Sequence, residues 1–392
     1  MANRSIVLLV ENPFTQRDYE RFGIDIFLKR GYRVKILQVT PITKPHVHRF
    51  VGFKKICDFH CIVNTLQQFQ NVIEKNKNSI VISFVQYGLL SFCLFRMLSK
   101  YNIRLCVLAF SGPFFSIKGK GKWLFRLQRI SIRNIIDYLF RYIKPCWLNI
   151  KDADICLVLG GQRYVAQEPI GAATKIIYGH AFDYDLFLKR KLPSGDLKEN
   201  IAVFLDEYAP YHPDDVNAGV TSIDATTYYG RLNNFFNKLE QETGLQVVVA
   251  AHPRSDYELH GNVFGKRRLE KGQTIDLIAQ AKLVVAHMST AVNFAILMKK
   301  PILLFATEEF MAANECFVLA LAQALGKKVY DAEDQKINFE EEMSIDYDIY
   351  EFYKKKYISV QNDCVKNSWE ILCDTLEMKI DNAEKINEIQ CK

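Results

Sequence analysis

Short apolar runs that end in polar tips are the feature that most constrains the fold of this chain. Residues 247–251 and 283–286 form two such runs, and each reads as a buried parallel strand. A third run, 302–305, comes after a helical pattern at 291–298. Strands that alternate with helices in this way pair in parallel, with helices on both faces of the sheet.

This alternation runs through the chain twice. In the first half we expect strands at 5–10, 32–39, 79–85, 104–109, 154–159 and 175–178, helices at 15–29 and 89–98, and a further helix within 54–74. In the second half we expect strands at 201–205, 247–251, 283–286, 302–305 and 328–330, and helices at 226–243, 274–281, 291–298 and 313–325. Thr274 suits the N-cap of the second of these helices. The sequence therefore predicts an α/β fold with two Rossmann-like doubly wound domains that face a cleft.

A polar stretch at 188–200, with Pro193, Ser194 and Gly195 together, is the best linker between the halves. In a chain of 392 residues it predicts an N-terminal domain at 1–192, a C-terminal domain at 193–345 and a helical tail at 346–392 that packs back on the first domain. The apolar stretch 80–97 carries polar residues in its middle, so it favours a strand, a turn and a helix over a membrane span.

The chain shows features of a cytoplasmic protein. Its first apolar run is five residues long and continues into a strand pattern, so we expect no signal peptide. The ten cysteines are scattered, which favours free thiols in a reducing compartment. The net charge of +7 indicates an anionic partner without selecting which kind.

Residues 116–144 form a basic amphipathic segment. It holds eight Lys or Arg residues and one acid, Asp137, with aromatic residues between them. Such a helix can lie on an anionic membrane surface, which would place the protein at the inner face of the cytoplasmic membrane. The alternative is a surface helix that packs on its own domain. No nucleic-acid-binding module surrounds the segment, so we expect no nucleic acid partner.

Two polar tips predict an anion site. His252-Pro253-Arg254 follows the strand 247–251, and His287-Met288-Ser289-Thr290 follows the strand 283–286. Ligands of open α/β sheets bind where strands end and helices begin. An imidazole and a guanidinium can bond to phosphate oxygens, and the hydroxyls of Ser289 and Thr290 stand at a helix start. His287 fits either a binding or a structural role.

Acidic residues follow the first strand of the second half. Asp206 and Glu207 are adjacent at its end, and His212 comes shortly after. A carboxylate there can act as a general base if burial or a neighbouring charge shifts its pKa. Asp214 and Asp215 read as turn residues, and Lys266-Arg267-Arg268 reads as a solvated loop.

Two patterns could suggest metal, but neither is specific. Asp183-Tyr184-Asp185 has the D-x-D form with which some sugar-nucleotide enzymes hold a divalent cation, although the tripeptide is common. Cys57, His60 and Cys61 lie downstream of two histidines, but the spacing matches no strong zinc template. We expect neither a metal nor another cofactor.

The order of an acidic pair, His-Pro and Ser-Thr resembles the bacterial sialyltransferase-type glycosyltransferases of the GT-B fold. Asp206-Glu207, His252-Pro253 and Ser289-Thr290 carry the resemblance, which covers about residues 200–305. The surrounding sequence is also similar to glycosyltransferase-like proteins of bacterial surface-polysaccharide clusters. The chain departs from the pattern at Tyr208, where those families usually have glycine.

The resemblance implies transfer of a keto-sugar acid, of the sialic, legionaminic, pseudaminic or Kdo type, from a CMP donor. The acceptor would be a glycan or lipid-linked glycan of capsule, O-antigen or lipopolysaccharide, bound by the N-terminal domain. His252, Ser289 and Thr290 would stabilise the phosphate, Arg254 the sugar carboxylate, and Asp206, Glu207 or His212 would be the base. Alternatives are a UDP- or GDP-sugar or CDP-polyol donor, a metal-dependent D-x-D transferase, and a non-catalytic scaffold of a polysaccharide cluster.

Overall fold

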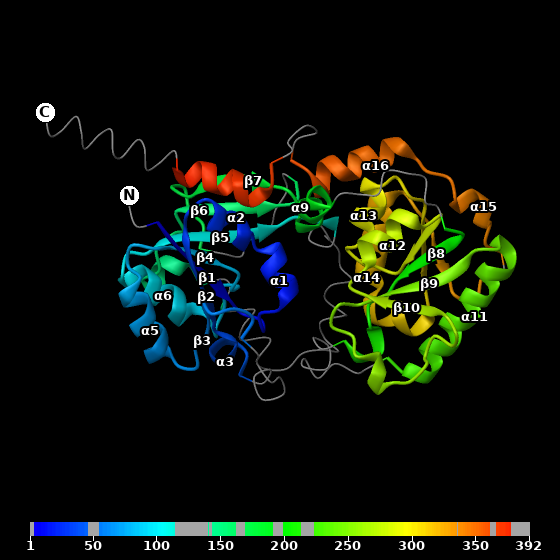
Figure 1. Cartoon of the computed structure of the whole chain (residues 1–392), viewed down its shortest axis with the longest axis horizontal. Helices are drawn as coiled ribbons and strands as arrows, with labels where there is room; N and C mark the ends of the chain where they lie inside the picture. Colours follow the sequence, from blue (N-terminus) through cyan, green and yellow to red (C-terminus); the bar gives the residue numbers. More distant parts are fainter. Residues whose placement is uncertain are drawn as a thin grey trace, which may run out of the picture. The chain divides into compact units, whose positions relative to one another are not determined.

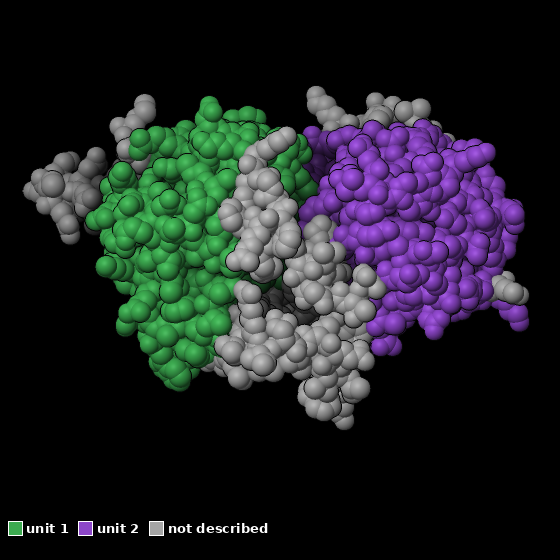
Figure 2. All heavy atoms as spheres, turned by 90° about the horizontal axis from the view of Figure 1, so that it is seen from below, with its two compact units in different colours: residues 1–111, 130–185, 360–392 green, residues 112–129, 186–359 purple. Residues whose placement is uncertain are grey.

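The computed structural model describes residues 4–45, 55–113, 140, 143–161, 169–190, 199–212, 223–334, 336–360 and 366–377. Two compact units make up the chain (Figures 1 and 2). Unit 1 comprises the described residues of 1–111, 130–185 and 360–392, and unit 2 those of 112–129 and 186–359. Each unit is built around its own parallel sheet.

The sheet of unit 1 has seven strands in the order β3-β2-β1-β4-β5-β6-β7, all of them parallel. From β1 the chain adds β2 and β3 on one side of the sheet and then β4 to β7 on the other. The strand order therefore switches between β1 and β4, as in doubly wound sheets. The strands are β1 (Ser5–Val10), β2 (Arg33–Gln38), β3 (His60–Ile62), β4 (Ile80–Ser83), β5 (Arg104–Phe110), β6 (Ile155–Leu159) and β7 (Lys175–Gly179).

The sheet of unit 2 has six parallel strands in the order β10-β9-β8-β11-β12-β13. Numbered within the unit, this is the Rossmann order 3-2-1-4-5-6, with the switch between β8 and β11. The strands are β8 (Ile201–Leu205), β9 (Gln246–Ala251), β10 (Arg268–Lys271), β11 (Leu283–Ala286), β12 (Ile302–Ala306) and β13 (Val329–Asp331).

These two sheets confirm the predicted α/β class with two Rossmann-like doubly wound domains, which is the domain composition of a GT-B protein. The cleft between the domains stays a prediction. The apolar stretch 80–97 forms strand, turn and helix as expected, with β4 followed by α6 (Phe92–Lys100). In the described part of the chain, no helix has both the length and the apolar character needed to span a membrane.

Unit 1 contains α1 (Gln16–Arg21), α2 (Ile24–Lys29), α3 (Thr40–Thr43), α5 (Leu66–Lys75), α6, η2 (Pro145–Leu148) and α9 (Phe182–Lys189), the last of which runs across the boundary into unit 2. The single helix predicted at 15–29 is wrong, because it breaks into α1 and α2 at Gly23. Gly23 adopts a left-handed conformation with a φ of 69°. A Cβ atom on it would lie 2.2 Å from Cγ of Trp369, so glycine also provides the space for that ring.

The range 54–74 holds the predicted helix, but it also holds a strand that was not predicted. Residues His60–Ile62 form β3, which pairs with β2, and the helix α5 starts only after Thr65. The His60 ring is fully buried and hydrogen-bonds to Gln38 of β2, 3.1 Å away. The Thr65 side chain accepts the backbone N–H of Gln68 and caps α5. The hydrogen bond between the side chains of His60 and Gln38 therefore joins β3 to β2 in addition to their backbone pairing.

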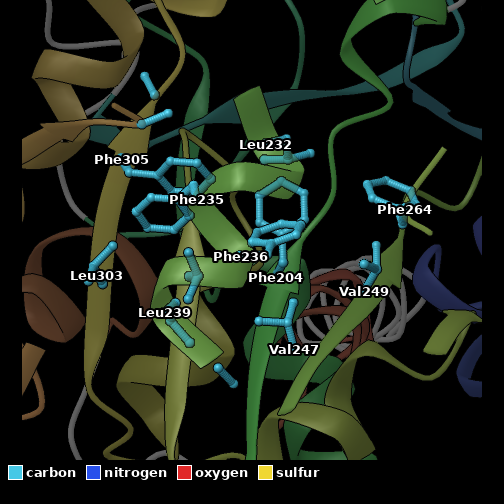
Figure 3. Packing of buried hydrophobic residues seen from close by; sticks show 14 of the residues in the cluster. Phe204, Leu232, Phe235, Phe236, Leu239, Val247, Val249, Phe264, Leu303 and Phe305 are labelled. Atoms are coloured by element: carbon cyan, nitrogen blue, oxygen red, sulfur yellow. The ribbon is translucent and has the colours of Figure 1, made fainter. Parts of the chain in front are cut away.

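Unit 2 contains η3 (Ala209–Tyr211), α11 (Ala225–Thr243), η4 (Tyr257–Leu259), α12 (Thr274–Gln280), α13 (Val292–Leu297), α14 (Glu308–Leu325), α15 (Phe339–Glu342), α16 (Tyr347–Tyr353) and the π-helix η5 (Lys354–Ile358). The long helix α11 is capped by Asp224 and ends at Gly244, which has a φ of 68°. Its apolar face packs on the sheet. Figure 3 shows Phe235 of α11 beside Phe305 of β12, and their rings stack with centroids 3.9 Å apart.

Two smaller expectations for unit 2 are wrong. Lys266-Arg267-Arg268 is not simply a solvated loop, because Arg268 begins the edge strand β10 and Arg267 makes an ion pair of 2.7 Å with Glu240. Thr274 is not the N-cap of α12 but its first residue. The edge strand was missed because its residues are mostly exposed and charged, so they show no apolar pattern.

The C-terminal region divides between the units. Residues 347–358 are helical in unit 2, and a helix at 368–377 belongs to unit 1. The Trp369 ring is fully buried there, and its Nε1–H donates to the carbonyl oxygen of Arg21 at 2.7 Å. Residues 116–139, 141 and 142 lie outside the described residues, as do Asp214 and Asp215, so the predictions for them remain open.

Candidate functional site

Three strand ends meet at the carboxyl edge of the unit 2 sheet. Asp206 and Glu207 directly follow β8, His252 follows β9, and residues 287–290 follow β11. β8 lies between β9 and β11, so all three tips are neighbours. The switch in strand order lies between β8 and β11, which is where open α/β sheets bind ligands.

The side chain of Asp206 ties the first two tips together. It is buried, with 4% of its surface exposed. Its Oδ1 accepts the backbone N–H of Tyr208 at 2.9 Å, and its Oδ2 accepts the backbone N–H of His252 at 3.0 Å. Burial raises the pKa of Asp206 while these hydrogen bonds act in the opposite direction. Both carboxylate oxygens of Asp206 thus accept backbone N–H groups of the loops that follow β8 and β9. The role of Asp206 as a base stays a prediction.

Glu207 bridges the switch point. Its Oε1 accepts the backbone N–H of Met288 at 2.8 Å, which links the tip of β8 to the tip of β11. Its Oε2 is buried and has no hydrogen-bond partner among the described residues. Burial raises the pKa of Glu207 to about 8. Near neutral pH this carboxyl group can therefore gain or lose a proton, as an acid-base group must.

His212, His252 and Arg254 form a group that we call the His–Arg cluster. Nη2 of Arg254 lies 3.2 Å from Nε2 of His212, and the backbone N–H of Arg254 donates to Nδ1 of His252 at 3.2 Å. The two imidazole rings have centroids 5.0 Å apart. Pro253, between His252 and Arg254, is exposed. The structure thus brings together three predicted residues that can bind an anion.

His287 lies below this edge, in the core. It is fully buried, its Nδ1 bonds to the carbonyl oxygen of Phe305 at 2.6 Å, and its Nε2 bonds to the hydroxyl of Tyr228 at 3.0 Å. Burial lowers the pKa of His287 to about 4, so the ring is neutral at neutral pH. These contacts favour the structural role for His287, and its part in donor binding stays a prediction.

Ser289 and Thr290 lie at the tip of β11, one turn before α13. The Ser289 hydroxyl accepts the backbone N–H of Ala291 at 3.3 Å, and Thr290 is exposed. The helix starts at Val292 and is six residues long, so it is a weaker dipole than the predicted helix 291–298. The two hydroxyls lie on the correct sheet edge for the proposed phosphate contact, which stays a prediction.

Sequence reasoning missed an aromatic group around Tyr208. Tyr208 follows Glu207 in a left-handed conformation with a φ of 55° and a ψ of 36°. Glycine adopts that conformation without strain, whereas a tyrosine with its Cβ atom does not. The hydroxyl of Tyr208 lies 2.8 Å from Nε2 of His260, whose ring stacks on Tyr211 at 3.7 Å. A partner 52 residues away leaves no local pattern in the sequence.

The Asp183-Tyr184-Asp185 motif lies on α9 and fastens unit 1. Asp183 makes an ion pair of 2.7 Å with Arg21, and Asp185 accepts the backbone N–H of Ser368 at 3.0 Å. Both aspartates are buried. Over the described ranges, no group of three or more His, Cys, Asp or Glu side chains is arranged to hold a metal ion. The motif is therefore accounted for by packing contacts.

No family model matches the chain, and no curated protein matches it. Among solved structures, it is similar to CalG4, the calicheamicin glycosyltransferase, at 12% identity and a TM-score of 0.47 over 91% of this chain and 93% of that one. It is similar to the UDP-GlcNAc 2-epimerase from Methanocaldococcus jannaschii at 11% identity and a TM-score of 0.47, over 95% and 99%. An alpha-glucosyltransferase in complex with UDP and DNA gives 10% identity and a TM-score of 0.44, over 96% and 99%. Likenesses this distant do not assign an activity, and the fold rests on the strand order itself.

Proposed function

We propose that this chain is a glycosyltransferase that takes its sugar from a nucleotide-activated donor bound at the carboxyl edge of unit 2. The observation that carries the proposal is that Glu207, the His–Arg cluster and residues 287–290 lie at the carboxyl ends of three neighbouring strands, β8, β9 and β11. Such an edge offers an acid-base group beside an anion site, which are the two chemical functions that glycosyl transfer from a nucleotide needs.

The His–Arg cluster supports a diphosphate donor over the CMP donor expected from the resemblance. One guanidinium and two imidazoles, all of which can donate hydrogen bonds to phosphate oxygens, lie together beyond the ends of β8 and β9. A nucleoside diphosphate leaves with two phosphate groups, so it can use more of these contacts than CMP, which leaves with one. A UDP-sugar is therefore the donor that we propose first, and a CMP-keto-sugar is the alternative.

Glu207 is the base that we propose. In the transfer step, the acceptor hydroxyl gives its proton to Oε2 of Glu207 as the acceptor oxygen bonds to the anomeric carbon. The bond from that carbon to the phosphate oxygen breaks, and the nucleotide leaves with the electron pair. The unpartnered Oε2 and the raised pKa both support this role, because the carboxylate gains most by accepting a proton.

For the acceptor we propose the carboxyl edge of the unit 1 sheet. Glu11 and Asn12 directly follow β1 at its switch point, and Nζ of Lys44 lies 2.8 Å from Oδ1 of Asn12 and 3.9 Å from Glu11. Phe110, at the end of β5, is 38% exposed. Polar groups beside an aromatic face suit a sugar, whose ring has hydroxyls and an apolar face. Phe110→Ala should raise the acceptor KM, whereas Trp147→Ala, which removes another exposed aromatic residue of unit 1, should not.

The first test measures which nucleotide stabilises the protein. We expect a nucleoside diphosphate, with UDP the first candidate beside GDP and CDP, to raise the Tm more than CMP does. Arg254→Ala should weaken binding of that diphosphate about tenfold, which is about 1.4 kcal/mol. Arg268→Ala is the matched control, because Arg268 is also an exposed arginine of the same sheet but begins β10 at the opposite edge.

Each outcome of this test has a defined meaning. Stabilisation by CMP alone would replace the UDP donor by the CMP-keto-sugar donor. If none of the four nucleotides raised the Tm, the donor site in unit 2 would be excluded. Hydrolysis of the activated sugar without any glycan product would leave an epimerase-like or hydrolytic activity in place of transfer. Binding without any turnover would favour the non-catalytic scaffold.

We also propose that the protein works at the cytoplasmic face of a membrane, where lipid-linked acceptors are made. The basic composition of 116–144 is the reason, since such a segment is attracted to anionic lipids. Co-sedimentation with phosphatidylglycerol vesicles, but not with phosphatidylcholine vesicles, would support it. Equal co-sedimentation with both kinds of vesicle would exclude attraction to anionic lipids as the cause of membrane binding.

A further inference from the structure

The turn that follows Glu207 is strained and needs an external restraint. Tyr208 has a φ of 55° and is one of the few described non-glycine residues with a positive φ. For a residue with a Cβ atom, this conformation costs about 1–2 kcal/mol. Strain of this kind persists only where surrounding contacts hold it, and it is often found at functional sites.

Hydrogen bonds at both ends of Tyr208 hold the turn, one of them to the backbone of Asp256. The backbone N–H of Tyr208 donates to Asp206, and its carbonyl oxygen accepts the backbone N–H of Tyr211 at 3.0 Å. At the far end of the side chain, the hydroxyl of Tyr208 bonds to Nε2 of His260 at 2.8 Å. The His260 ring lies parallel to Tyr211, with an angle of 2° between the two planes. The side chain that causes the strain is thus fastened at its tip.

We propose that the Tyr208–His260 hydrogen bond is a latch that positions Glu207 for proton transfer. Tyr208 is the next residue after Glu207, so its conformation sets the direction in which the backbone leaves the glutamate. Glu207 must reach Met288 across the switch point, and this contact at 2.8 Å depends on that direction. His260 has no part in the chemistry itself, and it acts as a positioning residue through Tyr208.

The inference rests on the proposed function for its effect on rate, but the latch can also be observed without turnover. The backbone N–H of Met288 donates to Glu207, and this bond should slow its hydrogen exchange. Loosening the latch should therefore speed hydrogen exchange at Met288, whatever reaction the protein catalyses. Exchange at this amide and the rate of transfer are two independent readouts.

The test is a double-mutant cycle. Tyr208→Phe and His260→Ala each break the same bond, so each should lower kcat about tenfold, and the double variant should also lose about tenfold rather than about a hundredfold. The donor KM should stay within about twofold, since neither the Tyr208 hydroxyl nor His260 belongs to the His–Arg cluster. His260→Gln keeps a donor and an acceptor near the hydroxyl, and it should restore most of the rate.

Tyr330→Phe is the matched control. Its hydroxyl donates to Glu342 at 2.9 Å in the same unit, so the variant also loses a buried tyrosine bond. It should alter neither kcat nor exchange at Met288. The latch is overturned if Tyr208→Phe behaves like Tyr330→Phe in both readouts, or if the two latch variants combine additively. If transfer is absent in the wild type but exchange at Met288 rises as expected, the proposed function fails and the latch stands.

Discussion

Asp206 and Glu207 are adjacent, yet their carboxyl groups have different partners. Asp206 has both oxygens bonded to backbone N–H groups, whereas Glu207 has one oxygen bonded to Met288 and one without a partner in the described chain. The sequence could place both acids at a strand end but could not rank them as bases. The ranking depends on which N–H groups surround each side chain, and those come from strands far apart in the sequence.

The raised pKa of Glu207 makes a prediction about stability. Because the folded pKa, about 8, lies above the ordinary value of 4.5, the folded state favours the protonated form. The contribution of Glu207 to the free energy of unfolding is therefore fully present below about pH 4.5. It is lost as the pH rises through 8, by about 1.4 kcal/mol for each unit by which the pKa is shifted. Glu207→Gln removes this dependence, because the amide does not titrate.

Urea unfolding of wild type and Glu207→Gln at pH 5, 7 and 9 measures the difference. We expect the variant to gain free energy of unfolding relative to the wild type as the pH rises, and the gain to stop near pH 9. Asp224→Asn is a control, because the hydrogen bonds of that N-cap lower the pKa of Asp224 and its effect lies at acidic pH. A constant difference between wild type and Glu207→Gln would contradict the buried carboxyl.

At the scale of elements, the core strands could be predicted because they are apolar and short. The strands at 5–10, 201–205 and 283–286 were predicted with the bounds that the structure has, and all are buried on both faces. The two missed strands, β3 and β10, lie at sheet edges and are three and four residues long. Edge strands carry polar residues, so the sequence shows no apolar run for them.

The break between α1 and α2 tests a second element-scale point. Gly23 and Gly31 both have a positive φ, of 69° and 77°. Gly31→Ala should lower the free energy of unfolding by about 1–2 kcal/mol, which is the usual penalty for a Cβ atom in this conformation. Gly23→Ala should cost about 1–3 kcal/mol more, because its Cβ would lie 2.2 Å from the Trp369 ring, whereas that of Gly31 would meet no described atom within 4 Å.

The free energy of unfolding of the two glycine variants, measured in urea, decides this prediction. Their backbone penalties are similar, so the difference between them isolates the contact with Trp369. Equal losses would mean that the ring moves aside at little cost. A larger loss for Gly23→Ala would show that the helix break exists to admit the tryptophan.

At the scale of the whole molecule, unit 1 is completed by the end of the chain. Its sheet is built from residues before 180, but its core also contains Trp369, Leu372, Cys373 and Leu376 of the last described helix. Ser368 fastens this helix to β7, because its hydroxyl accepts the backbone N–H of His180 at 2.7 Å. The sequence predicted that the tail packs on the first domain but not which residues do so, since a helical pattern does not identify its partner.

Trp369→Ala should therefore destabilise unit 1 selectively. Removing a fully buried tryptophan costs about 3–5 kcal/mol, and here a hydrogen bond to Arg21 is lost as well. Hydrogen exchange should increase in β1 and β5, whose side chains belong to that unit, and should stay unchanged in β8 and β12. Trp147→Ala removes a tryptophan that is 71% exposed and should change neither unit by more than about 0.5 kcal/mol. If exchange rose equally in both units for Trp369→Ala, the two units would unfold as one cooperative body, and the C-terminal helix would stabilise unit 2, with its proposed donor site, as well as unit 1.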